Sequence, residues 1–227
     1  MTDLANLEST LDYQFSDQEL LNRALTHRSY RKLNNERLEF LGDSILGFVI
    51  AETLFHQFPR AAEGDLTKMR ARLVRGSTLA LLSRELGIRE FLLLGEGEKK
   101  SGGFDRDSIL ADALEAIFGA IYLDGGFRAA RTAVLNLYAN LLREIKPEDL
   151  KDNKTRLQEY LQKVEKGLPI YEVISQSGKP HNLKFEVSCK IDHAQSPFIA
   201  SGTSRRIAEQ EAAGKAFEAL TSATPGD

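Results

Sequence analysis

The stretch Ile109–Leu123, which reads I-L-A-D-A-L-E-A-I-F-G-A-I-Y-L, decides the fold of the N-terminal part of the chain. Asp112 and Glu115 are its only charged residues. A helix that is apolar on nearly all sides is buried among other helices, so this stretch predicts the centre of a helical domain. Two buried carboxylates need a positive partner to stay ionised. No basic residue between Arg106 and Arg128 can supply one locally.

Helical periodicity extends from this stretch over nearly the whole region between Asp17 and Leu142. Apolar residues recur there at steps of three and four, and strand signals are nearly absent. Pro59 ends the longest early helix, because proline cannot continue one. The predicted helices are Asp17–Thr26, Glu36–Phe58, Leu66–Val74, Ser77–Leu86, Ser108–Leu123 and Arg128–Ile145. We therefore expect an all-α domain over residues 1–146.

The period changes after residues 147–153, which we predict to be a linker because they are polar and lack periodicity. Beyond the linker, Phe185, Val187, Cys189 and Ile191 alternate with polar residues, a pattern typical of a half-buried strand. The predicted elements are a helix over Lys154–Lys166, strands over Ile170–Ser175, Leu183–Ile191 and Phe198–Ser201, and a helix over Ser204–Leu220. They predict an α+β domain over residues 154–222, ordered α-β-β-β-α, in which two helices cover one face of an antiparallel sheet.

Composition narrows the function classes. The 227 residues are 42% hydrophobic and 28% charged, which are ordinary globular proportions. The longest run without charged or strongly polar residues, Ala116–Leu123, is far shorter than the roughly 20 residues that cross a bilayer, so we expect no membrane partner. No secretory signal is readable and Cys189 is the only cysteine, which favours the cytoplasm. With a net charge of −3, nucleic-acid binding would depend on local basic patches.

Acidic residues lie where two predicted helices could bring them together. Glu36, Glu39 and Asp43 are spaced i, i+3, i+7 and share one helical face. If this helix crosses the one that carries Asp112 and Glu115, four carboxylates converge and repel one another unless a divalent cation lies among them. Oxygen ligands without His or Cys suit Mg²⁺ or Mn²⁺, and such clusters commonly serve phosphodiester hydrolysis. The alternative is that each acid pairs with a nearby basic residue or caps a turn.

The first of these helices also carries a family resemblance. Asn35–Ser44, which reads N-E-R-L-E-F-L-G-D-S, closely resembles the signature of the ribonuclease III family of double-stranded RNA endonucleases. The likeness continues through Glu63–Arg70, Gly95–Glu98 and Ser108–Ala116 and into the C-terminal domain. It implies a Mg²⁺-dependent endonuclease, with Mn²⁺ as a substitute, whose products carry 5′-phosphates, 3′-hydroxyls and short 3′ overhangs. It suggests ribosomal RNA precursors and structured messenger RNAs as substrates.

The resemblance assigns roles to several acids and to one aromatic residue of the helical domain. The acids are the Mg²⁺ ligands Glu39, Asp112 and Glu115, the catalytic residues Asp43 and Glu115, and the supporting acids Glu36 and Glu63. The family forms a homodimer through this domain, and Phe40 matches a residue that packs into the partner subunit. A phenylalanine at this position could equally belong to the core of its own chain.

The C-terminal domain resembles a double-stranded RNA-binding domain. The RNA-binding residues that this likeness implies are Gln158, Gln162, His181, Ser204, Arg205 and Arg206. The two glutamines share one polar helix face and can reach a minor groove, although such a pair is also common on a solvated face. The histidine lies in a loop, and the last three residues open a helix whose free N–H groups and dipole favour phosphate. Ile207 stands where relatives can carry a charge, which thins the basic patch.

Two other functions remain open from the sequence. A non-catalytic duplex-RNA-binding protein would show an eroded acid set, whereas the set is intact here. A helical dimetal phosphohydrolase acting on small nucleotides would leave residues 154–220 without a function.

Two further stretches resemble known motifs only in part. Gly95–Ser101 does not match a Walker motif, because Lys99 stands where that motif has glycine, and Gly42–Ser44 lacks the second glycine of a nucleophile elbow.

Overall fold

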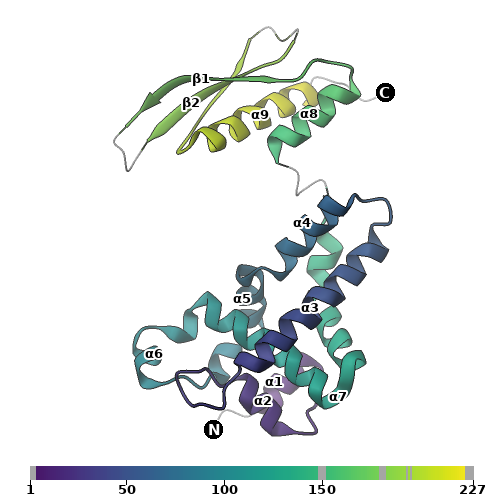
Figure 1. Ribbon diagram of the computed structural model, residues 1–227, viewed down its shortest axis with the longest axis vertical. Coiled ribbons are helices and arrows are strands. Elements are labelled where there is room, and N and C mark those ends of the chain that lie inside the picture. Colours follow the sequence, from purple (N-terminus) through teal and green to yellow (C-terminus); the bar gives the residue numbers. More distant parts are fainter. Residues whose placement is uncertain (1–3, 148–151, 179–182, 193, 195, 223–227) are drawn as a thin grey trace. The chain divides into compact units, whose positions relative to one another are not determined.

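The computed structural model describes residues 4–147, 152–178, 183–192, 194 and 196–222. The chain divides into two compact units, Met1–Pro147 and Glu148–Asp227, drawn in purple to teal and in green to yellow in Figure 1. The helices of the first unit are α1 (Leu4–Leu11), α2 (Gln18–Ala24), α3 (Glu36–Gln57), α4 (Glu63–Val74), α5 (Gly76–Glu85), α6 (Glu96–Lys100) and α7 (Asp107–Glu144). Two 3-10 turns, η1 (Ile88–Phe91) and η2 (Gly103–Asp105), connect α5 to α7 by way of α6. The predicted helical domain is therefore confirmed.

Local signals explain where several of these helices begin and end. Asp17 caps α2, since its Oδ1 accepts the N–H of Glu19 at 2.9 Å. Phe58 leaves the helical conformation at the end of α3, directly before Pro59. The predicted start of α4 at Leu66 was wrong, because the helix already begins at Glu63. The short helices α1 and α6 were not predicted.

Helix α7 joins two helices that the sequence predicts as separate. They are divided at Gly126, whose φ of 76° and ψ of −178° are accessible to glycine and strongly disfavoured for other residues. Beyond this kink, the second half of α7 runs beside α3, as Figure 1 shows. The Nε of Arg131 lies 3.0 Å from Oε2 of Glu52, and the side chain of Gln57 donates to the carbonyl of Leu142 at 2.8 Å.

The first half of α7 crosses α3 with the two backbones in close approach. A Cβ atom on Gly42 would lie 1.7 Å from the carbonyl oxygen of Glu115, and one on Gly119 would lie 2.2 Å from that of Leu38. Because neither glycine has a Cβ atom, the backbones of α3 and α7 come into direct contact at both positions. Leu114 and Phe118 are completely buried in this part of α7, as the apolar stretch predicts.

The second unit contains α8 (Asn153–Lys163), β1 (Ile170–Ser177), β2 (Lys184–Lys190), β3 (Phe198–Gly202) and α9 (Arg205–Ser222). The three strands are antiparallel in the order β1-β2-β3, with a register shift between Val173 and Ser175. Cys189 of the central strand is buried in a core shared with Leu157 and Leu161 of α8 and with the alanines of α9. The predicted α-β-β-β-α domain, with two helices on one face of the sheet, is confirmed. Across the described parts of both units, none of the helices combines the length and the apolar character needed to span a membrane.

Candidate active site

Three carboxylates meet at the crossing of α3 and α7. Glu39 comes from α3, whereas Asp112 and Glu115 lie one turn apart on α7. One carboxylate oxygen from each lies within 4.8 Å of the other two. The contact of Gly42 with the backbone of Glu115 brings the helices close enough for this, because Gly42 follows Glu39 by less than one turn. The predicted convergence of acids from two helices is therefore present for three of the four acids, and Asp43 is not one of this group.

The environment of the cluster disfavours negative charge. Burial is the main reason why the pKa of Glu39, Asp112 and Glu115 is raised above the ordinary value of each carboxyl. At Glu115 the neighbouring charges of Asp43, Asp112 and Glu39 add to burial and bring the pKa to about 8. At Asp112 the nearby His27 opposes the rise. Without a cation, the cluster therefore holds protons that free carboxylates would release.

The three other predicted acids occupy different places. Asp43 is exposed on α3, and its charge raises the pKa of both Glu39 and Glu115, so it faces the cluster. Glu36 lies one turn before Glu39 and accepts a hydrogen bond from the amide of Asn34 at 3.0 Å. Glu63 is not brought to the cluster within one chain: it begins α4, and its Oε1 accepts a hydrogen bond from Thr67 at 2.8 Å.

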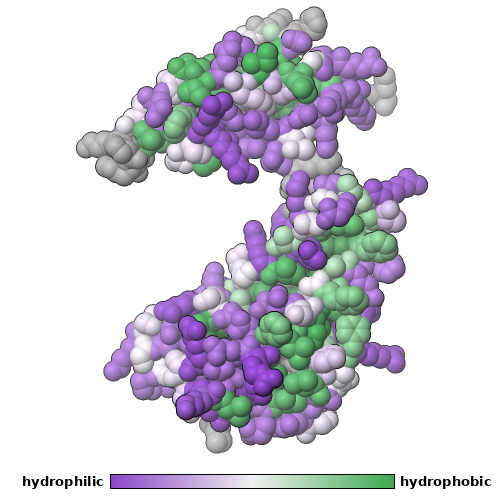
Figure 2. Space-filling model, viewed as in Figure 1, coloured by the Kyte–Doolittle hydropathy of each residue, from purple (hydrophilic) through white to green (hydrophobic). Residues whose placement is uncertain are grey.

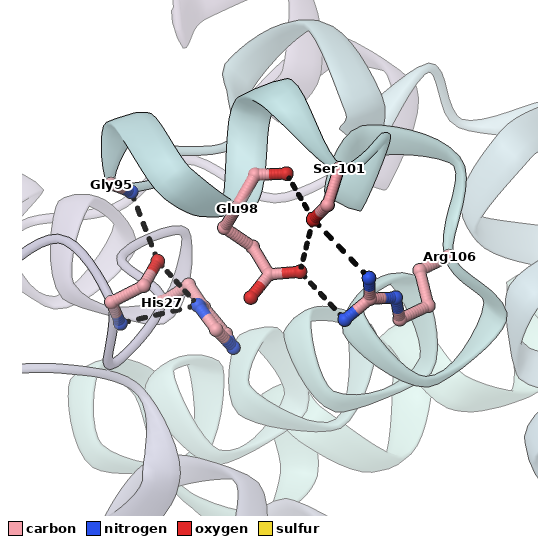
Figure 3. Close-up of polar contacts among 6 residues, drawn as sticks. His27, Gly95, Glu98, Ser101 and Arg106 are labelled. Carbon is pink, nitrogen blue, oxygen red and sulfur yellow. Dashed lines mark hydrogen bonds and ion pairs between the residues drawn. The ribbon is translucent and has the colours of Figure 1, made fainter.

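A hollow of about 480 Å³ opens beside Glu39 and Asp112. His27 forms part of its wall and is held by Ser29, whose N–H donates to the imidazole Nδ1 at 3.2 Å. The Oγ of Ser29 in turn accepts the N–H of Gly95 at 2.9 Å (Figure 3). Burial lowers the pKa of His27, so the ring is neutral and its proton belongs on Nε2, away from Ser29.

The opposite wall of the hollow is tied to the start of α7. The Oε1 of Glu98 lies 2.6 Å from Nη1 of Arg106, which precedes the first residue of α7. Ser101 bridges the same pair: its hydroxyl contacts Glu98 and accepts a hydrogen bond from Nη2 of Arg106 at 3.4 Å (Figure 3). This ion pair links α6 to the helix that carries Asp112.

Sequence reasoning missed the residues that line this hollow from outside the acidic helices. They are His27, Arg28, Asn35, Glu98 and Arg106. Most of them lie in loops or at helix ends, where no hydrophobic period marks their position. Arg106 stands directly before the apolar helix, and this position could have identified it as a residue near the acids.

An exposed aromatic row lies on α3 beside the acidic cluster. Phe40 is 78% exposed, and Phe48 and Phe55 follow on the same side of the helix at 56% and 64%. Phe48 packs edge-on against Phe127, with ring centroids 5.7 Å apart. Figure 2 shows hydrophobic residues gathered on this unit. Phe40 is thus absent from the core of its own chain.

The residues predicted to bind RNA lie at the outer surface of the second unit where the structure describes them. Gln158 and Gln162 are exposed on α8, and Arg206 is exposed at the start of α9. Ser204 precedes α9, and its Oγ accepts the N–H of Ile207 at 3.3 Å. Arg205 donates a hydrogen bond from its Nε to Oε1 of Glu209 at 2.7 Å. His181 lies outside the described residues.

The donor set of the cluster suits a hard cation. The three groups are carboxylates from two rigid helices, and their oxygens lie close enough to bind one ion together. Carboxylate oxygens are the ligands preferred by Mg²⁺ and Mn²⁺, and a bound cation would favour the deprotonated form that burial disfavours here. The residues present therefore fit a divalent cation.

Two family descriptions match the chain and together cover both units. "Ribonuclease-III-like" matches residues 17–142, and "Double-stranded RNA binding motif" matches residues 153–220. The fold and the acidic site thus define a two-domain protein of the ribonuclease class. The relatives narrow this assignment. "Ribonuclease 3" of Vibrio vulnificus strain YJ016 is 58% identical over 219 residues, or 96% of this chain and 97% of that protein. The protein of the same name from Vibrio cholerae is 57% identical over 216 residues, which cover 95% and 96% of the two chains. The chain belongs to the ribonuclease III family.

Solved structures agree with this assignment for the helical unit. The nuclease domain of ribonuclease III from Campylobacter jejuni superposes with a TM-score of 0.61 at 47% identity, over 64% of this chain and all of that one. A second structure of that domain, described in terms of a flexible region involved in dimer formation, gives a TM-score of 0.60 at 48% identity over 61% of this chain and 97% of that one.

Proposed function

We propose that this protein is an endoribonuclease that hydrolyses both strands of double-stranded RNA with the help of Mg²⁺. The observation that carries the proposal is the cluster of Glu39, Asp112 and Glu115 in a chain that also contains a double-stranded RNA binding motif. In this proposal the acidic cluster catalyses hydrolysis, and the second domain binds the double-stranded RNA. Mn²⁺ is the expected substitute, because it accepts the same oxygen ligands.

Each acid has its own part in this proposal. Glu39, Asp112 and Glu115 would hold the cation, which supplies activation of water and stabilisation of the leaving oxygen when bound. Asp43 is exposed and lies near enough to the cluster for its charge to act on Glu39 and Glu115, and in this proposal it would hold the attacking water through a hydrogen bond. Together with Glu115 it forms the proposed catalytic pair. No covalent enzyme intermediate is involved.

The two remaining acids of the proposed set have supporting parts. Glu36 faces the hollow beside the cluster, where it helps to define the path of the RNA backbone. Glu63 is distant from the cluster of its own chain and is assigned to the RNA-facing surface only. Neither is proposed as a ligand of the cation.

The division of labour follows three proposed segments. Residues 1–146 form the endonuclease domain, residues 147–153 the linker and residues 154–222 the RNA-binding domain. In the last, Gln158 and Gln162 would contact 2′-hydroxyls in a minor groove, and His181 would reach the next one. Ser204, Arg205 and Arg206 would bind phosphate at the start of α9.

We further propose a homodimer formed by the helical domain. The aromatic row of Phe40, Phe48 and Phe55 is an apolar surface of the kind that marks protein interfaces. Phe40 would insert into the partner subunit. Two copies would then present two acidic clusters, one for each strand of the duplex.

The products and the cellular setting follow from the same proposal. Water attack on the phosphorus with departure of the 3′-oxygen, which takes up a proton, leaves 5′-phosphate and 3′-hydroxyl ends, and two offset sites would leave short 3′ overhangs. Ribosomal RNA precursors and structured messenger RNAs are the proposed substrates. The single cysteine, Cys189, is buried and free, which agrees with the reducing cytoplasm as the proposed compartment.

Incubation of the purified protein with long duplex RNA tests the proposal. Discrete shortening in Mg²⁺, and an intact duplex in chelator, are expected. Binding without cleavage in Mg²⁺ would instead identify a non-catalytic RNA-binding protein. Hydrolysis of small nucleotides with the duplex untouched would identify a phosphohydrolase.

A further inference from the structure

A partly buried carboxylate bridges two basic residues at the starts of α8 and α9. The Oε2 of Glu209 lies 2.9 Å from Nζ of Lys154, and its Oε1 accepts a hydrogen bond from Nε of Arg205 at 2.7 Å. The side chain of Glu209 is only 12% exposed, whereas that of Arg205 is 64% exposed. A carboxylate thus lies in a surface that is proposed to bind a polyanion, although its charge would repel the phosphates.

Lys154 is partly exposed and has two partners within the domain. Besides its ion pair, its Nζ lies 4.3 Å from the centroid of the Tyr171 ring. The same two basic neighbours lower the pKa of Glu209 despite its burial. Lys154 therefore balances the charge of Glu209 within the protein, and the positive charge of Arg205 is left over for an external partner.

Glu209 engages Arg205 through one nitrogen only. A guanidinium presents five N–H donors in a rigid plane, and the bond to Nε uses one of them. The two Nη groups carry four further donors, and no ion pair to them is found among the described residues. The bond to Nε fixes the plane of the guanidinium, while the edge formed by the two Nη groups stays available for a bidentate contact with phosphate.

We propose that Glu209 is a positioning residue for duplex RNA: it holds Arg205 by Nε so that its two Nη groups face a backbone phosphate, while Lys154 neutralises the carboxylate. This inference rests on the proposed function, because it names the way in which one predicted RNA contact is oriented. Glu209 itself does not touch the RNA.

Lysine cannot replace arginine in such an arrangement. Its single ammonium has no separate edge for the carboxylate and for the phosphate, and Glu209 is already in place four residues along the helix. We therefore expect the ammonium of an Arg205→Lys variant to pair with Glu209 instead of a phosphate. At Arg206, for which no ion pair is found among the described residues, the same replacement leaves the ammonium free to meet a phosphate.

The test is the equilibrium binding of the full chain to a duplex RNA of about 30 base pairs in chelator, so that cleavage does not interfere. Arg205→Lys is expected to weaken binding about three- to tenfold and to lower the salt slope by about one phosphate contact. The double variant Arg205→Lys with Glu209→Gln is expected to regain most of this loss, because the amide releases the ammonium. Arg206→Lys is the comparison at the neighbouring phosphate contact and should lose distinctly less affinity than Arg205→Lys, because no carboxylate is found beside it among the described residues.

Three results would overturn the inference while leaving the proposed function intact. Unchanged binding by Arg205→Lys would mean that the guanidinium plane is unimportant. An equal loss in Arg206→Lys would mean that arginine is needed irrespective of Glu209. A double variant that stays as weak as Arg205→Lys, although its thermal unfolding is unchanged, would remove Glu209 from the explanation. If the unaltered chain bound no duplex even at low salt, the proposed function and this inference would both fail.

Discussion

Replacing Gly42 by alanine should push α3 and α7 apart at the point where their acids meet. The added Cβ would lie 1.7 Å from the carbonyl oxygen of Glu115 and 2.5 Å from its carbonyl carbon. Such contacts need about 3 Å or more, and the obstacle is helix backbone, which cannot rotate away. The two helices must therefore separate by roughly 1 Å or more.

The expected effect on stability follows from two opposing contributions. Overpacking that displaces backbone costs about 3 kcal/mol, whereas alanine gains up to about 1 kcal/mol over glycine in a helix. A net loss of roughly 2 kcal/mol corresponds to a melting temperature lower by roughly 5–10 °C for a domain of this size. Cleavage should fall further, by about 10²-fold, because Glu39 moves relative to Glu115.

Urea unfolding and duplex cleavage at saturating Mg²⁺ measure the two effects separately. Gly64→Ala is the matched control: it also adds a methyl group to a helix, but nothing lies within 4 Å of its Cβ position. It should be neutral or stabilised by less than about 1 kcal/mol. If Gly42→Ala were as stable and as active as Gly64→Ala, the close crossing of α3 and α7 would not be what assembles the cluster.

Three further outcomes are expected from residues at the site and at the proposed interface. Glu115→Gln should bind duplex RNA with an affinity within about twofold of the unaltered chain. In single-turnover assays it should cut the duplex at least about 10²-fold more slowly, because a charge that holds the cation is lost. Equal loss of binding and cutting would contradict the assignment. In the folded chain without metal the pKa of Glu115 is raised from 4.5 to about 8, so the folded state binds more protons than the unfolded state between these values. Stability in chelator should therefore fall as the pH rises from about 5 to 8, and melting curves of Glu115→Gln should lack that part of the dependence. Phe40→Ala should weaken self-association more than tenfold in sedimentation equilibrium, whereas Leu81→Ala, which alters a 51% exposed side chain on α5, should leave it unchanged.

The helical unit could be predicted largely because its signals are long and periodic. The stretch around Asp112 and Glu115 identified a buried helix with two acids, and α3 showed three acids on one face. Their meeting, however, depends on Gly42 and Gly119, which allow a close approach that no periodicity encodes. Short elements such as α6 span too few residues to show a period.

The surroundings of the cluster escaped prediction for a different reason. His27 and Glu98 reach the hollow from loops or short helices far apart in the sequence, and only the tertiary structure brings them to Asp112. In the second unit, alternation predicted β2 well. The spacing of Arg205 and Glu209 by four residues was a readable helical pair, yet the contribution of Lys154 from another helix was not.

The crossing of α3 and α7 lowers the stability of the helical domain for as long as the acids are present. Acidic groups that burial and mutual repulsion disfavour are concentrated at the close crossing of the two helices, so the site opposes the packing that creates it. Replacing Glu39 by glutamine should accordingly raise the free energy of unfolding in chelator while abolishing the chemistry. The helical domain thus contains a trade-off between robustness and activity, and its most stable sequence is not its working one.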